Sequence, residues 1–345
     1  MNPFVQLTLV KLREYTREPE SLFWVFAFPV LMTLALGIAF RGGATTEVRV
    51  GVVQDGAHAA SAAQLTNMLD ADPRIAAVGV PSAGSQALLR DGKVAVVVEP
   101  GDPVTYRFDP TRPESAVARF TVDDVLQRAG GRRDAFTPDE QLVIIPGGRY
   151  IDWLVPGLLG MNVLMTGVWG IAFTLGMSRA KKLLKRLSST PMKRAHFLGA
   201  QIAGRLLFLP IEAGVLLLFA RLAFDVPIEG SWLLLTAIII LGAVMGGALS
   251  LLIASRARSF EAVSGLINFA TLPMWIFSGV FFASANFPEV MQPFIQALPL
   301  TAMVDAVRGV MLEGATLAAV GGEVAIVAAW GALSLLVAVR IFRWQ

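Results

Sequence analysis

Long stretches of apolar residues alternate along this chain with short polar or basic segments. A stretch of about 20 apolar residues is long enough to cross a hydrocarbon core of about 30 Å as a helix. Such stretches occur at residues 22–40, 151–177, 196–222, 231–254, 260–284 and 319–341. The pattern therefore predicts an α-helical polytopic membrane protein with six transmembrane helices, the first within residues 21–41 and the others within residues 150–345.

Residues 42–149 have a different pattern, in which short β-branched runs alternate with more polar segments. The predicted strands are residues 48–54, 75–80, 94–98 and 104–108, and the predicted helices are residues 59–70, 85–90 and 113–129. Strands that alternate with helices are typical of a small α/β domain. We expect such a domain to be inserted after the first span.

The N-terminal segment, residues 1–20, has the spacing of an amphipathic helix. We expect it to lie in the plane of the membrane interface, and a solvated arm is the alternative interpretation. A cleaved signal peptide is a second interpretation of residues 22–40. It is disfavoured because the apolar stretch is longer than the about 7–15 residues of a signal peptide, and because no small-residue cleavage site follows.

Residues 285–318 are apolar but are interrupted by Pro288, Pro293 and Pro299. Apolar pieces of about 10–14 residues are more typical of re-entrant or interfacial helices than of spans. The sequence therefore predicts two short re-entrant helices on the external side, at about residues 288–312. Asp305 and Arg308 are three positions apart, so their side chains could pair on one face of the second helix.

The distribution of Lys and Arg predicts the orientation of the spans. Residues 178–195, which follow the second span, contain several lysines and arginines and no Asp or Glu. Short loops with an excess of Lys and Arg stay in the cytoplasm. The other short loops agree with this assignment, so both termini are expected in the cytoplasm and residues 42–149 outside it.

The composition agrees with a membrane location. The chain is 55% hydrophobic and 16% charged, with a mean hydropathy of +0.62, whereas soluble domains have about 25% charged residues. The net charge of +3 does not indicate nucleic-acid binding, because Lys and Arg gather at predicted cytoplasmic ends of helices. The absence of cysteine excludes disulfides, thiolate metal sites and cysteine nucleophiles. The sequence also lacks a P-loop, so a pump of this sequence needs energy from another subunit.

Two groups of residues stand out inside the spans. Glu212 lies near the middle of the third span, and Arg205 lies seven positions earlier on the same helix face. An ionisable residue at such a depth marks a functional site by default, although Glu212 could instead be a structural acid held by hydroxyls or by a carbonyl freed at Pro210. Gly242 and Gly246, with Ser250, form a row of small residues that favours close helix packing.

The order of these features resembles a known family. The chain resembles the permease subunits of ABC-2 type exporters, in the bacterial branch with a large external domain. The features that carry the resemblance are, in order, an amphipathic helix, one span, an external domain, the basic segment KKLLKRLSSTPMKR and the segment LPLTAMVDAVRGVMLEG before the last span. The resemblance implies an ATP-driven exporter in the bacterial inner membrane. It implies that this chain forms a dimer with an identical or different permease chain, and that the dimer pairs with two ATPase subunits. The ATPase subunits would bind ATP and Mg. This chain itself would bind no cofactor and would not be an enzyme.

The same resemblance implies roles for particular residues. The basic loop would hold the helix that couples the permease to the ATPase, and the re-entrant pair, with Pro293, Pro299, Asp305 and Arg308, would close the pore externally. The sequence departs from many relatives because Ser178–Arg194 contains no acidic residue, which leaves open the ATPase that fits. Lipid anchoring by the lysines is the alternative. The predicted coupling residues are Lys181, Lys182, Leu183, Leu184, Lys185, Arg186, Leu187 and Pro191.

Two other classes of protein fit the sequence less well. A membrane-embedded protease or metalloenzyme would need paired aspartates, Ser with His, or clustered histidines in the spans, and the sequence has none of these. A membrane receptor or sensor with an external ligand-binding domain would account for residues 42–149 but not for the re-entrant region. The apolar residues do not identify a substrate, because facing lipid requires the same residue types.

Overall fold

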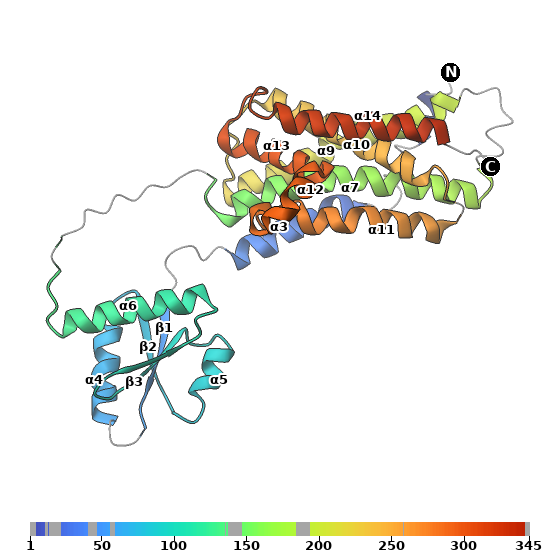
Figure 1. Cartoon of the computed structure of the whole chain (residues 1–345). Coiled ribbons are helices and arrows are strands. Elements are labelled where there is room, and N and C mark those ends of the chain that lie inside the picture. Colours follow the sequence, from blue (N-terminus) through green and yellow to red (C-terminus); the bar gives the residue numbers. More distant parts are fainter. Residues whose placement is uncertain are drawn as a thin grey trace. The chain divides into compact units, whose positions relative to one another are not determined.

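The computed structural model describes residues 5–10, 13, 22–40, 47–55, 59–134, 136, 147–183, 194–257 and 259–341. The chain forms two compact units (Figure 1). The helical unit consists of Met1–Arg41 and Ile144–Gln345, and the α/β unit consists of Gly42–Val143. Of the amphipathic helix predicted at residues 1–20, residues 5–10 and 13 are helical and the others lie outside the described residues.

The α/β unit contains a four-stranded mixed sheet in the order β2-β1-β3-β4. Strands β2 and β3 run parallel to β1, and β4 runs antiparallel to β3. The elements in chain order are β1 Val48–Val53, α4 Ala59–Asp70, β2 Ile75–Val80, α5 Ser85–Arg90, β3 Val96–Glu99, β4 Thr105–Phe108 and α6 Pro113–Ala129. The sequence-predicted strands and helices are therefore present, with β1, β3 and β4 each one residue shorter than expected.

The alternation of side chains along the strands divides this unit into three layers. Val50 and Val52 of β1 pack with residues of α4 and α6, such as Leu69 and Val122. Val53, on the opposite face of β1, belongs to a second cluster with Val80, Val94 and Val97, which is covered by Leu88 and Leu89 of α5. Successive side chains of a strand point to opposite faces, so valine-rich strands are buried on both faces of this sheet.

The helical unit contains long apolar helices and several shorter ones. Its elements are the π-helix η1 Phe23–Ala27, α3 Phe28–Ala39, α7 Tyr150–Ala180, α9 Arg194–Phe224, α10 Trp232–Ala254, α11 Phe260–Phe277, the 3₁₀ turns η3 Ser284–Asn286 and η4 Glu289–Met291, α12 Gln292–Ala297, α13 Pro299–Glu313 and α14 Gly321–Ile341.

The described residues contain five helices that are long and apolar enough to cross a membrane. A sixth is present if Glu289–Ala297 and Pro299–Glu313, which are bent by 85°, are counted as one broken span. Phe23–Ala39, at the first predicted span, is a shorter apolar helix. The helix predicted over residues 260–284 was too long: α11 ends at Phe277, and Gly279 follows with a left-handed φ of 71°.

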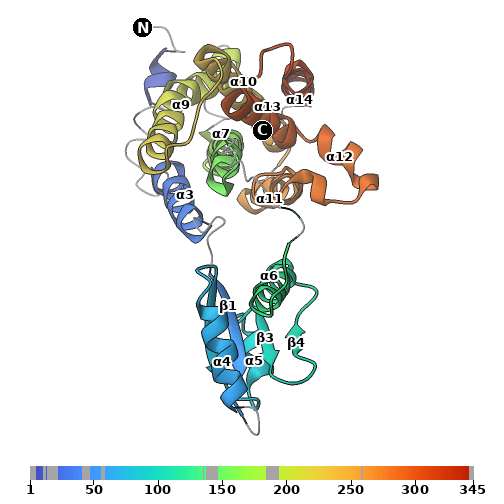
Figure 2. The same cartoon turned by 90° about the vertical axis from the view of Figure 1, so that its left-hand side faces the viewer.

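Helix α7 lies at the centre of the helical unit (Figure 2). It contacts α3, α9, α10, α11 and α13. Its approach to α10 is close, because a Cβ atom added to Gly246 would lie 2.8 Å from the carbonyl oxygen of Leu164. One turn further along α10, the hydroxyl of Ser250 donates a 2.7 Å hydrogen bond to the carbonyl of Val168. Gly242 of the same row meets Met303 of α13. Small residues thus allow three helices to pack closely.

Candidate functional site

A buried ion pair joins the two polar residues predicted from the third span. Arg205 and Glu212 of α9 form a salt bridge, and their side chains are 2% and 0% exposed. Thr166 of α7 completes the cluster: its hydroxyl donates a 2.9 Å hydrogen bond to Glu212 Oε1, and its oxygen accepts one from Arg205 Nη2. The sequence pointed to Arg205 and Glu212 but not to Thr166, because that contact depends on how α7 packs on α9.

This polar cluster extends to the N-terminal helix. One turn before Thr166, the side-chain amide of Asn162 donates a 3.2 Å hydrogen bond to the carbonyl oxygen of Val25 in η1. Thr166 also lies 2.6 Å from the carbonyl oxygen of Asn162. The polar groups therefore connect η1, α7 and α9 inside the apolar unit. Breaking one partner of a buried ion pair is costly, since the other is left as an uncompensated charge.

A second buried cation lies on α13. Arg308 lies 3.2 Å from Asp305 of the same helix, so the structure brings this predicted pair together. Arg308 also makes contacts that the sequence did not indicate. Its Nη2 donates to the carbonyl oxygens of Gly279 at 2.9 Å and Trp153 at 3.3 Å, and its guanidinium lies 3.3 Å from the centre of the Trp153 ring. Arg308 thus ties α13 to α7 and to the turn after α11.

Proline residues define the bent pair α12–α13. Pro293 and Pro299 lie in the first turns of α12 and α13, where a missing backbone N–H costs nothing because it would have no partner within the helix. The indole Nε1 of Trp330 in α14 donates a 2.8 Å hydrogen bond to the carbonyl of Ala297, next to the bend. Most of α13 is buried. Two short helices therefore occupy the region in which the sequence predicted them.

The predicted coupling segment begins where α7 ends. Lys181 is the C-cap of α7, Lys182 has a left-handed φ of 55°, and both are exposed, as is Leu183. The other predicted residues of this segment lie outside the described residues: Leu184, Lys185, Arg186, Leu187 and Pro191.

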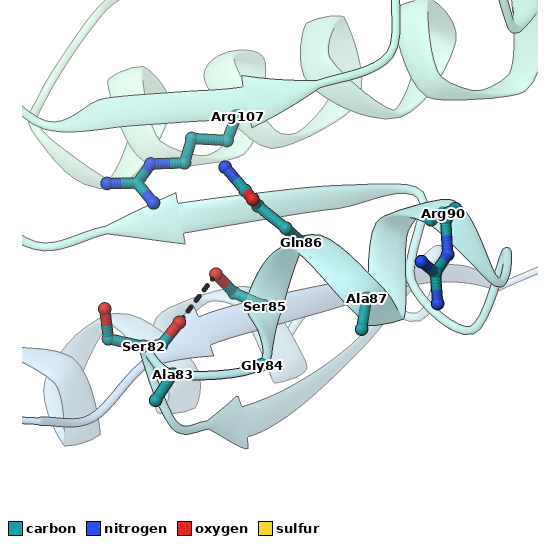
Figure 3. A pocket seen from close by; sticks show the side chains of 8 residues that line it. All are labelled: Ser82, Ala83, Gly84, Ser85, Gln86, Ala87, Arg90 and Arg107. Carbon is teal, nitrogen blue, oxygen red and sulfur yellow. Dashed lines mark hydrogen bonds between the residues drawn. The ribbon is translucent and has the colours of Figure 1, made fainter.

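A cavity of about 730 Å³ lies in the α/β unit between α5 and β4 (Figure 3). It is lined by residues 82–87, Arg90 and Arg107. Arg107 is paired with Glu99 at 2.6 Å, and Arg90 lies 3.3 Å from Asp91. Both cations of the lining are therefore already paired with carboxylates. The part of the chain that the structure describes contains no group of three or more His, Cys, Asp or Glu residues that could hold a metal ion.

Comparison with known proteins identifies a family over most of α6 and the helices from α7 to α13. Residues 116–312 match the ABC-2 type transporter family. Because this match covers more than half of the 345 residues, the chain belongs to that family. It is a multi-pass membrane protein and the permease component of an ABC transporter.

Two curated proteins are similar to part of this chain. The chain is 27% identical over 169 residues to ABC transporter G family member 20 of Dictyostelium discoideum, which is 49% of this chain and 23% of that protein. It is 24% identical over 163 residues to the inner membrane transport permease YadH of Escherichia coli K12, which is 47% of this chain and 63% of that protein. The matched region thus spans less than two thirds of each relative.

Proposed function

We propose that this chain is the membrane-spanning permease subunit of an ATP-driven exporter of the bacterial branch that has a large external domain. The observation that carries the proposal is the family match over residues 116–312, which includes α7, α9, α10, α11 and the bent pair α12–α13. Two permease chains, identical or different, form the translocation path as a dimer. The re-entrant pair α12–α13 closes that path on the external side.

The arrangement of helix ends supports one topology. The rings of Phe40, after α3, and Tyr150, at the start of α7, are 4.3 Å apart. The end of α3 and the start of α7 therefore lie at the same end of the helical unit. Lys181 and Lys182 lie at the opposite end of α7, and α14 also ends there (Figure 1). With six spans and the basic end in the cytoplasm, the α/β unit is external. Similarity to YadH, which is named as an inner membrane transport permease, supports a location in a bacterial inner membrane.

The energy for transport comes from separate ATPase subunits that hold ATP and Mg, because this sequence has no P-loop. The segment of residues 178–195 docks on them. Affinity purification of the tagged full chain from its native membrane in mild detergent, followed by protein identification and mass measurement, tests this. An ABC ATPase and a mass of two permease and two ATPase chains are expected. Recovery of the permease without any ATPase, or with a sensor kinase, would contradict the proposal.

A further inference from the structure

Arg179, in the last turn of α7, reaches across to the end of α10. Its Nη2 donates to the carbonyl oxygen of Ser255 at 2.9 Å, and its Nη1 donates to the carbonyl oxygens of Ala257, at 2.9 Å, and Ala254. Ala254 is the last residue of α10 and Ser255 is its C-cap. One guanidinium therefore binds three backbone carbonyls in the turn that leads to α11.

These contacts are favourable for a physical reason. The last carbonyls of a helix have no partner within the helix and carry the negative end of its dipole. A guanidinium has a planar set of donors and stays charged, so it can bind several such carbonyls together. An arginine that only anchors the chain to lipid phosphates would direct its donors to the headgroups. Arg179 instead directs its N–H donors to backbone carbonyls of its own chain. It therefore links two helices in addition to placing a positive charge at the membrane surface.

The surrounding packing makes this contact a junction of three helices. Near the same end of α7, the Phe173 ring meets the ring of Phe260 in α11, with centroids 4.4 Å apart. A Cβ atom added to Gly176 would lie 3.1 Å from Val263 of α11. Helix α7 ends at Ala180, the residue after Arg179, and the predicted coupling segment continues from the C-cap Lys181. A displacement of that segment therefore acts first on the Arg179 junction.

We propose that Arg179 is a positioning residue that transmits movement of the coupling segment to α10 and α11. This inference rests on the proposed function, because the movement originates in the ATPase. Without the guanidinium, the carbonyls at the end of α10 lose their link to α7. Movement of the coupling segment then displaces the turn between α10 and α11 less.

Hydrogen–deuterium exchange on the purified permease–ATPase complex tests this proposal without a known substrate. Exchange is compared between the nucleotide-free complex and the complex trapped with ADP and vanadate. In the unmodified chain, trapping should change exchange both in residues 178–195 and in the turn at residues 255–262. In Arg179→Gln, the change at residues 178–195 should persist and the change at residues 255–262 should become much smaller.

Two further variants complete the test. Arg340→Gln removes an exposed arginine from the last turn of α14, so it controls for the loss of a basic charge and should leave both responses intact. Arg179→Lys keeps the charge but not the fork of donors, and should weaken the response of the turn. It also replaces the glutamine variant if that variant does not fold.

The outcomes separate the two proposals. If no ATPase copurifies with the unmodified chain, the proposed function fails. If the complex forms and residues 255–262 respond as strongly in Arg179→Gln or in Arg179→Lys as in the unmodified chain, the role of Arg179 is overturned. An equal loss of response in Arg340→Gln would also overturn it, because charge alone would then explain the effect.

Discussion

Arg308, Arg205 and Arg179 make polar contacts at successive positions along α7. Arg308 contacts Trp153, Arg205 contacts Thr166, and Arg179 is itself part of α7. The three α7 positions involved, 153, 166 and 179, are thirteen residues apart, which corresponds to a helix rise of about 20 Å from one to the next. A buried guanidinium needs several acceptors, and carbonyls at helix ends and turns supply them at both ends of α7. Of these three arginines, only Arg205 depends on a buried carboxylate.

That dependence predicts the stability of variants of the Arg205–Glu212 pair. Glu212→Leu leaves Arg205 charged and without its carboxylate in the apolar interior, and should destabilise the chain by about 3–5 kcal/mol. The double variant Arg205→Met with Glu212→Leu should recover most of this loss, because two apolar residues replace the whole pair. Thermal unfolding of the detergent-purified variants measures the effect. A double variant as unstable as the single one would contradict it.

The same variants separate a structural role from a role in transport. If Glu212 serves transport, Glu212→Gln should preserve assembly with the ATPase and lower export, and the stable double variant should not regain export. The ratio of export to bound ATPase measures this. Normal export by the double variant would restrict the pair to holding α9 against α7.

At the scale of elements, the sequence predicted the bounds of most helices but not the contacts between them. The helices expected at residues 59–70, 85–90 and 113–129 coincide with α4, α5 and α6, because polar residues and turns mark their ends. The end of α11 was missed because Phe281 and Phe282 continue the apolar stretch beyond the turn at Gly279. The contacts of Arg308 with Trp153 and Gly279 could not be predicted, since they depend on which helices become neighbours. The roles of the site residues remain predictions.

The close approach of α7 and α10 gives a test at this scale. Gly246→Ala puts a methyl group about 2.8 Å from the carbonyl oxygen of Leu164, which forces the helices apart and should lower the thermal unfolding midpoint. Gly265→Ala in α11 is the matched control, because an added Cβ atom there meets nothing within 4 Å. That variant should be neutral or slightly stabilising, since alanine favours helix. Equal midpoints for the two variants would contradict the packing argument.

At the scale of the whole molecule, the side of the membrane on which the α/β unit lies determines the orientation of every span. The chain has no cysteine, so single cysteines can be introduced and labelled with an impermeant thiol reagent in intact cells. Ala129→Cys, at the exposed end of α6, should be labelled if the α/β unit is external. Arg256→Cys, in the exposed turn after α10, should react only after the membrane is opened. Labelling of Arg256→Cys in intact cells would reverse the proposed topology.

Coupling of ATP hydrolysis to transport also involves the whole molecule. If the segment after α7 docks on an ATPase, its apolar residues should matter more than its lysines, because buried contacts carry most binding energy at an interface whereas lipid-facing lysines only anchor. Leu183 is exposed just after α7 ends, as a docking residue would be in the separate chain. Replacing Leu183 and Leu187 together with Ala should therefore weaken ATPase association and abolish export while membrane insertion continues.

The matched control replaces Lys181 and Lys182 with Gln. These residues flank the same helix end and are exposed, so the change removes charge without removing apolar contact. It should reduce ATPase association less than the leucine pair does, as measured by the amount of ATPase that copurifies with each variant. If the lysine pair proves essential and the leucine pair dispensable, the segment is an electrostatic anchor. The force of ATP hydrolysis would then have to reach α7, α10 and α11 through another cytoplasmic contact.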